Sequence, residues 1–195
     1  LQSLAIDETF DFFNPKAGLT YSLSTASSIY TSYAFASKEP VRNDYVESAA
    51  NARPTAERMH NIEAGYRIRK ENLNIGTNVY GMFYKDQLIL TGEINDVGSV
   101  LRENVPNSYR IGIEFDGSWI VSDKFTWNAT AAFSSNKIKN YKEYLGVLDE
   151  NWSDTGAPQV IKEYNSTTIS FSPSTVLSNE FVYALYNPFR ISLTS

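Results

Sequence analysis

The chain has 195 residues and a formal net charge of −5, with 42% apolar and 20% charged residues. This composition excludes a disordered chain, and the absence of Lys/Arg-rich runs excludes an electrostatic footprint for nucleic acid. The chain has no cysteine, which excludes disulfides and cysteine chemistry, and its single histidine, His60, makes a histidine metal site or a Ser-His-Asp triad unexpected. No apolar run approaches the roughly 18 residues of a membrane helix.

The first half of the chain contains two segment pairs that are typical of β-hairpins. Tyr and Phe, 13 and 11 in number, favour strands over helices. Residues 13–23 and 29–35 flank a small polar turn at 24–28. Residues 62–68 alternate between apolar and polar side chains, residues 70–72 form a turn, and alternation resumes from residue 73 to about 90.

The clearest alternation lies in the second half, at residues 109–121 and 125–134. Successive side chains of a strand point to opposite faces. One face carries Tyr109, Ile111, Ile113, Phe115, Phe125, Trp127 and Phe133, and the other carries Arg110, Glu114, Asp116 and Asn128. Residues 122–124 supply the turn of this third hairpin. A fourth, weaker hairpin follows at 175–183 and 190–193, with its turn near 186–188.

The connections predict a membrane barrel. Turns of about three to six residues close each hairpin, whereas long polar stretches at 37–58, 91–104 and 141–167 separate the hairpins. Short turns on one side and long loops on the other are typical of bacterial outer-membrane barrels, in which the strands are long and the polar face is wet. The expected fold class is therefore all-β, an antiparallel meander of about eight long strands, with a β-sandwich as the alternative.

Short motifs in a consistent order resemble TonB-dependent outer-membrane receptors over nearly the whole chain. The stretch NDVGSVLRENVPNSYRIGIE at 95–114 resembles a segment repeatedly met in that family. The segments NPKAGLTY at 14–21, PTAE at 54–57 before EAGY at 63–66, and MFYKDQL at 82–88 resemble other parts of its barrel, as do FSP at 171–173 and YNPF at 186–189.

The resemblance implies a larger architecture and a location. The family has a 22-strand transmembrane barrel that is closed by an N-terminal plug and energised by TonB. Residues 1–195 are expected to be part of that barrel, from its C-terminal half, with the plug domain and the final strands absent. The implied location is the outer membrane of a Gram-negative bacterium. The implied partners are membrane lipid and lipopolysaccharide, the plug and remaining strands, TonB, and a small nutrient ligand such as an iron chelate.

Two sets of residues are candidates for function. Aromatic and cationic side chains in the long loops suit contacts with a ringed ligand, and these are Tyr45, Arg53, Tyr144, Trp152 and Tyr164. A polar face is expected to line the lumen, and its members are Glu63, Arg67, Arg110, Glu114, Asp116 and Asn128. Glu114 and Asp116 are interpreted as lumen charge in preference to a catalytic acid–base pair. No catalytic residue, cofactor or metal is expected, so the chain is not expected to be an enzyme.

Three functions remain open from the sequence. The first is TonB-energised uptake, with an iron–siderophore complex as the expected cargo. The second is a self-contained eight-strand barrel that acts as an adhesin or small porin. The third is a soluble carbohydrate-binding β-sandwich. Hydrogen bonding between residues 13–23 and 190–195 would indicate the closed eight-strand barrel, whereas open edges would indicate part of a larger one.

Overall fold

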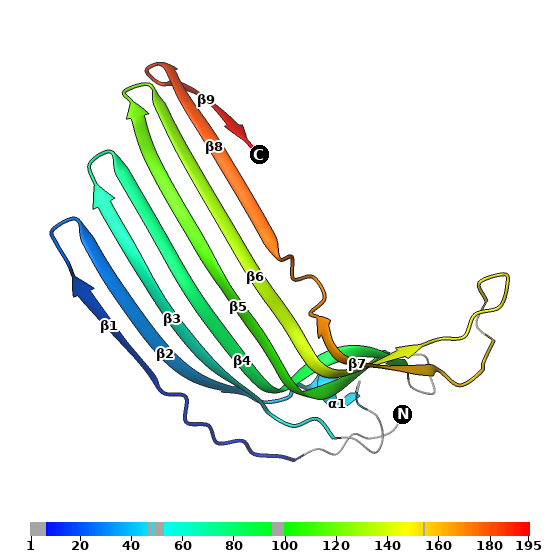
Figure 1. Ribbon diagram of the computed structural model, residues 1–195. Helices are drawn as coiled ribbons and strands as arrows, with labels where there is room; N and C mark the ends of the chain where they lie inside the picture. The colour runs from blue at the N-terminus through cyan, green and yellow to red at the C-terminus, as the bar shows by residue number, and fades with distance from the viewer. Residues whose placement is uncertain (1–6, 47, 49–52, 95–99, 154) are drawn as a thin grey trace.

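The fold is one antiparallel sheet, seen here in a computed structural model that describes residues 7–46, 48, 53–94, 100–153 and 155–195. Its strands are β1 (Lys16–Ser22), β2 (Ser27–Lys38), β3 (Glu57–Lys70), β4 (Leu73–Ile94), β5 (Val100–Ser122), β6 (Phe125–Leu145), β7 (Val160–Thr168), β8 (Thr175–Tyr186) and β9 (Phe189–Thr194). A short helix, α1 (Arg42–Val46), lies between β2 and β3. The strands lie side by side, nearly in chain order, across one curved sheet (Figure 1).

The topology is the predicted meander. The sheet order is β1-β2-β3-β4-β5-β6-β8-β9, and every pair is antiparallel. Tight turns join β3 to β4 and β5 to β6, as expected, because each leaves two residues between the paired strands. Within the described residues β1 pairs only with β2 and β9 only with β8, so the sheet is open at both edges.

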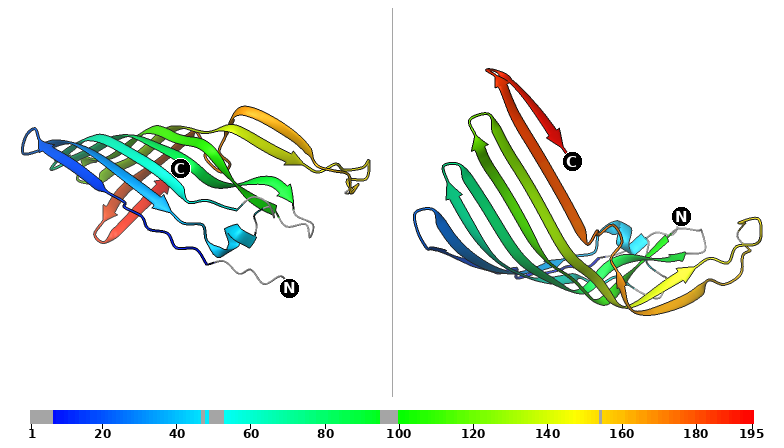
Figure 2. Two further views of the ribbon diagram at one scale, coloured as in Figure 1. Left: turned by 90° about the horizontal axis from the view of Figure 1, so that it is seen from below. Right: turned by 45° about the horizontal axis from the view of Figure 1, so that its top comes forward.

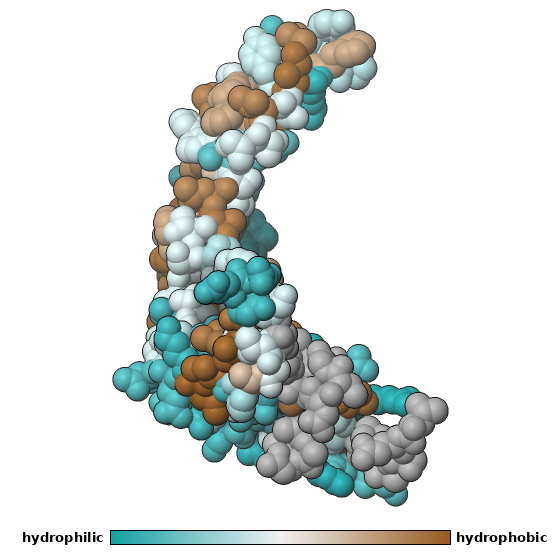
Figure 3. Space-filling model, turned by 90° about the vertical axis from the view of Figure 1, so that its right-hand side faces the viewer, coloured by the Kyte–Doolittle hydropathy of each residue, from teal (hydrophilic) through white to brown (hydrophobic). Residues whose placement is uncertain are grey.

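The sheet is bowed and a single layer thick over most of its length. The two views of Figure 2 show this curvature, and the side view in Figure 3 shows hydrophobic side chains spread along the strand region and hydrophilic ones gathered near its lower end. Among the described residues the buried hydrophobic side chains are Leu88, Leu101, Val105, Ile138 and Ile169. Val105, Ile138 and Ile169 form a small cluster, with Ile89 and Tyr141 packed against it. A fold of this kind has almost no core of its own, so its apolar surface needs an apolar surrounding.

The long polar stretches contain more strand than the sequence predicts. β4 continues to Ile94 and β5 begins at Val100, so most of 91–104 is paired strand; residues 95–99 of that prediction lie outside the described residues. The stretch 141–167 contains the end of β6 and most of β7. β7 is the strand by which the structure exceeds the expected eight. β7 carries polar side chains on both sides and lacks a continuous apolar face, and most of its residues are exposed. Its pairing with β6 and the Tyr141–Tyr164 ring contact at 6.4 Å hold it instead.

A six-residue bulge separates β7 from β8 opposite β6. β7 and β8 both pair with β6, and the six residues 169–174 stand opposite the three residues 134–136. Ile169 N donates to Asn136 O at 3.1 Å and Ser134 N donates to Ser174 O at 2.8 Å, so the ladder resumes on either side. Phe171 has a positive φ of 55° and is fully exposed. Pro173 cannot donate a ladder hydrogen bond, which explains why pairing stops here.

Candidate functional site

The two faces of the sheet differ in chemistry, and the register fixes which residues share a face. Tyr30 pairs with Gly65, Gly65 with Asn78, and Asn78 with Glu114. Directly paired residues project to the same side. The neighbouring residues Val79, Ile113 and Phe133 also pair with one another and lie on the other side. We call the first side the polar face and the second the apolar face.

Hydrogen bonds run across the polar face from strand to strand. The Tyr30 hydroxyl donates to Asn78 Oδ1 at 3.0 Å, and Asn78 Nδ2 donates to Glu114 Oε2 at 3.4 Å. The Tyr30 ring lies over Gly65, where a Cβ would overlap it. Glycine on one strand therefore accommodates an aromatic ring from the next, an arrangement that covers the glycine backbone.

All six residues that the sequence assigned to the lumen lie on the polar face. Glu63, Arg67, Arg110, Glu114, Asp116 and Asn128 share it by register. Asn128 Nδ2 donates to Glu180 Oε2 at 2.8 Å, so β8 continues the same polar row. Apolar side chains lie on the other face and are exposed, among them Val79 at 52% and Phe133 at 45%. An alternating sheet that exposes its apolar side has the polarity expected for a lipid-facing wall.

The bulge adds polar-face residues that sequence reasoning missed. Arg110 Nη1 donates to Ser172 Oγ at 2.8 Å, and Ser134 Oγ donates to the Pro173 carbonyl at 3.1 Å, so residues 169–174 fold over the polar face. Beside them lies a hollow of about 350 Å³, lined also by Glu63 and Glu114. The proline in FSP is the sequence signal for the interruption, but nothing in the sequence reveals the contact with Arg110.

Two of the loop candidates, Tyr45 and Arg53, converge on one carboxylate. The Tyr45 hydroxyl donates to Glu8 Oε2 at 2.8 Å, and Arg53 Nη1 lies 3.1 Å from Glu8 Oε1. Burial, followed by the hydrogen bond and negative charge of Glu8, raises the pKa of Tyr45 to about 12. The contact links the N-terminal segment to α1 across 37 residues of sequence, and nothing in the local pattern indicates it.

The other three loop candidates lie elsewhere. Tyr144 and Tyr164 belong to the β6–β7 hairpin, where the Tyr164 hydroxyl donates to Glu143 Oε2 at 2.9 Å. Burial, and then the charges of Glu93 and Glu103, raise the pKa of Tyr144. Trp152 lies in the connection beyond β6 with a φ of 60° and a side chain 83% exposed. The five loop candidates thus occupy three places, and their ligand contacts stay a prediction.

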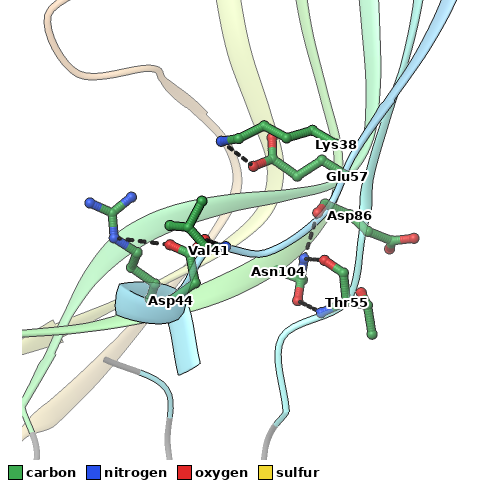
Figure 4. A network of polar contacts seen from close by, with 8 residues as sticks. Lys38, Val41, Asp44, Thr55, Glu57, Asp86 and Asn104 are labelled. Atoms are coloured by element: carbon green, nitrogen blue, oxygen red, sulfur yellow. Dashed lines mark hydrogen bonds and ion pairs between the residues drawn. The ribbon is translucent and has the colours of Figure 1, made fainter. Parts of the chain in front are cut away.

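A polar network fastens Asp44 and Thr55, which lie between β2 and β3, to β5 (Figure 4). Asn104 Oδ1 accepts from Thr55 N at 2.8 Å, and Asn104 Nδ2 donates to Thr55 O at 3.0 Å and to Asp86 O at 2.6 Å. Asp44, almost fully buried, accepts from Val41 N at 2.8 Å and lies 3.6 Å from Arg102 Nε. This connection is therefore held in place at two points on β5.

Replacing Glu8 by glutamine is expected to lower the pKa of Tyr45 from about 12 toward its ordinary value of 10.0, while burial keeps it above that value. A tyrosine whose pKa is raised on folding contributes stability below pH 10, and this contribution is lost as the pH rises toward about 12. The titration of ¹³Cζ-tyrosine resonances, with Tyr45→Phe to assign the signal, measures this pKa. An unchanged titration in Glu8→Gln would show that Tyr45 does not contact Glu8.

Two other kinds of site are absent from the part of the chain that the structure describes. That part contains no helix that is both long and apolar enough to cross a membrane. It also contains no group of three or more His, Asp or Glu side chains placed to hold a metal ion.

Comparison with known proteins places this geometry in a family. Residues 3–188 match the family described as TonB dependent receptor-like, beta-barrel. No curated protein matches. Among solved structures, the siderophore receptor PiuA from Acinetobacter baumannii superposes with a TM-score of 0.66 at 17% identity over 92% of this chain and 25% of that one.

Two further structures share the fold. The ferric-catecholate import receptor Fiu from K12 E. coli gives a TM-score of 0.60 at 13% identity over 91% of this chain and 23% of that one. The copper transporter OprC gives 0.57 at 12% identity over 91% of this chain and 32% of that one. The chain thus spans between about a quarter and a third of the length of these structures. The chain belongs to the TonB dependent receptor-like β-barrel family.

Proposed function

We propose that this chain forms part of the barrel wall of an outer-membrane receptor that takes up a scarce nutrient with energy supplied through TonB. The cargo that we propose is an iron–siderophore complex. The observation that carries the proposal is the segregation of the sheet into an exposed apolar face and a hydrogen-bonded polar face. Membership of the receptor family supports uptake as the activity, and siderophore receptors among the similar structures support the cargo.

The dimensions of the apolar face support a membrane position. Aromatic side chains on this face lie near the short turns, where Trp119 pairs with Trp127 and the Trp127 ring stacks on Phe181 at 6.2 Å. Tyr109 lies ten positions from Trp119 on β5. At about 3.3 Å per residue and a tilt of about 40°, this separation spans roughly 25 Å, the height of the apolar band of an outer-membrane barrel.

The proposed partners follow from this position. The remaining strands of a larger barrel would pair with the open edges of β1 and β9, and a plug domain would contact the polar face. Membrane lipid and lipopolysaccharide would surround the apolar face, and TonB would act through a part of the receptor outside this chain. The small ligand would meet Tyr45, Arg53, Tyr144, Trp152 and Tyr164 from the extracellular side, since long connections face outward in such barrels. No enzymatic step is proposed.

The alternatives receive less support. A closed eight-strand barrel needs hydrogen bonds between the first and last strands, but in the described part of the chain β1 and β9 each pair with a single neighbour. A β-sandwich needs a second sheet packed about 10 Å from the first, and the described strands all belong to one sheet.

Uptake is tested with the full-length receptor in a Gram-negative host that lacks its own siderophore receptors. Cells under iron limitation receive ⁵⁵Fe loaded on one catecholate and one hydroxamate siderophore, and cell-associated ⁵⁵Fe is counted with and without TonB. We expect at least one probe to accumulate only when both the receptor and TonB are present. Accumulation that is equal without TonB, or of neither probe, would contradict the proposal.

A further inference from the structure

A row of cations crosses the apolar face just beyond its aromatic side chains. Arg58 pairs with Lys85, Lys85 with Asn107, and Asn107 with Lys139. Lys137 lies in the adjacent row, opposite Tyr109. We call Arg58, Lys85 and Lys139 the cation row. All three side chains are exposed.

The cation row brings like charges together without local compensation. Arg58 and Lys85 are direct cross-strand partners, an arrangement that destabilises a sheet unless an anion lies nearby. Neither side chain makes an ion pair or hydrogen bond with another described residue, and Lys139 makes only a contact with the Tyr109 ring, with Nζ 6.0 Å from its centroid. The carboxylate next to Arg58 in sequence, Glu57, points to the other face and pairs with Lys38 at 3.5 Å.

Missing strands cannot supply the anion at this place. The row is flanked by Ser37 on β2 and Ser166 on β7, both part of this chain. The adjacent row toward the short turns contains no Asp or Glu, and its members are Phe35, His60, Phe83, Tyr109, Lys137 and Thr168. On the other side the alternation ends at Asp86, which has a positive φ of 56° and forms no ion pair with the cation row. Within the described residues no carboxylate pairs with the cation row, so its compensating charge comes from outside this part of the chain.

The position of the row identifies the kind of anion. It lies on the side of Tyr109 away from the short turns and from the Trp119–Trp127 pair, so it falls just outside the roughly 25 Å apolar band, at the extracellular interface. A surface between an aromatic belt and water meets lipid headgroups, and clustered Lys and Arg side chains there attract anionic ones. Arg and Lys side chains bind phosphate oxygens by charge-assisted hydrogen bonds.

We propose that Arg58, Lys85 and Lys139 form a binding site for the phosphorylated headgroup of an outer-leaflet lipid, with Lys137 and Tyr109 beside it. The inference rests on the proposed position of the chain in the outer membrane. The lipid's acyl chains lie along the apolar face below the row, against Phe83 and Ile111, and its phosphates neutralise the cations. The site fixes a phospholipid-like anion to the wall at β3–β6 and relieves the repulsion between Arg58 and Lys85.

The test measures binding of diphosphoryl lipid A to the purified full-length receptor in nonionic detergent micelles. We expect Arg58→Gln/Lys85→Gln/Lys139→Gln to weaken binding by about 100-fold, roughly five-fold per cation. The matched control, Lys70→Gln/Lys124→Gln/Arg190→Gln, removes the same charges at the short-turn end and should bind within about two-fold of the wild type. Wild-type affinity in the cation-row variant, or equal losses in both variants, would overturn the proposal.

Two further measurements distinguish lipid phosphate from free phosphate as the ligand. The binding assay also tests the lipid site separately from the proposed uptake function. Lipid A stripped of its phosphates should bind about as weakly as the cation-row variant binds the intact lipid, and inorganic phosphate should not displace diphosphoryl lipid A. Tight binding of the stripped lipid, or displacement by inorganic phosphate, would overturn the lipid site. Binding does not depend on transport, so a receptor that binds lipid A but imports no ⁵⁵Fe contradicts only the proposed function, and the reverse result contradicts only this inference. Gel mobility before and after boiling verifies that each variant is folded.

Discussion

Replacing Ala131 by lysine is expected to destabilise the barrel by about 2–4 kcal/mol, whereas the same replacement at the adjacent Thr130 is expected to change its stability by less than about 1 kcal/mol. Both residues lie on β6, between the Trp127 and Lys137 rows. Ala131 pairs with Phe115 and Leu177 on the apolar face. A lysine there would place an unpaired charge near the middle of the lipid.

Thr130 is a close control because it differs from Ala131 mainly in the face that it occupies. It pairs with Asp116 on the polar face, so a lysine at this position gains an oppositely charged cross-strand neighbour. Both variants add the same charge to the same strand, and differences in expression or net charge therefore cancel.

The measurement is denaturant unfolding of the full-length receptor in lipid vesicles, followed by tryptophan fluorescence. Equal destabilisation by the two variants would mean that both faces meet the same surroundings, which contradicts a lipid-facing wall. Greater destabilisation by Thr130→Lys would mean that the two faces are assigned the wrong way round.

The part of the fold that spans the proposed membrane could be predicted from the sequence for a physical reason. Where one face meets lipid and the other meets water, side chains must alternate, and residues 109–121 and 125–133 do so at all but a few positions, such as Ile120 and Ala132. The same alternation predicts that Arg110, Glu114 and Asp116 share one face, and the register places them together there. The turns at 71–72 and 123–124 followed from short polar interruptions.

The parts beyond the apolar band could not be predicted because that constraint is lost there. In the proposed position, β7 and the ends of β4 and β5 would have water on both sides, so polar composition would no longer distinguish a strand from a loop. Long-range contacts were also hidden: Glu8 meets Tyr45 and Arg53, and Asn104 holds Thr55 at a separation of 49 residues. Such contacts depend on how the connections fold back, which no local pattern encodes.

Close packing on the polar face predicts a second large loss of stability, when Gly112 is replaced by a residue with a side chain. A Cβ at this position would lie 2.7 Å from the Phe133 carbonyl oxygen and 2.8 Å from the Tyr80 hydroxyl. The first neighbour is backbone of β6 and cannot move without disturbing the β5–β6 ladder. We expect Gly112→Val to cost about 1–3 kcal/mol or more, as overpacking of a tight site does.

Gly117 on the same strand provides the matched control for this prediction. It lies on the apolar face, where the only atom within 4 Å of an added Cβ is the Asn74 carbonyl oxygen at 3.8 Å. Gly117→Val should therefore be neutral or slightly stabilising, since valine also has the higher strand propensity and an apolar side chain that suits lipid. Unfolding in vesicles compares the two variants, and we expect Gly112→Val to unfold at the lower denaturant concentration. Equal midpoints would show that the space beside Gly112 accommodates a side chain without loss, which would contradict tight packing of Gly112 against the Phe133 carbonyl and the Tyr80 hydroxyl.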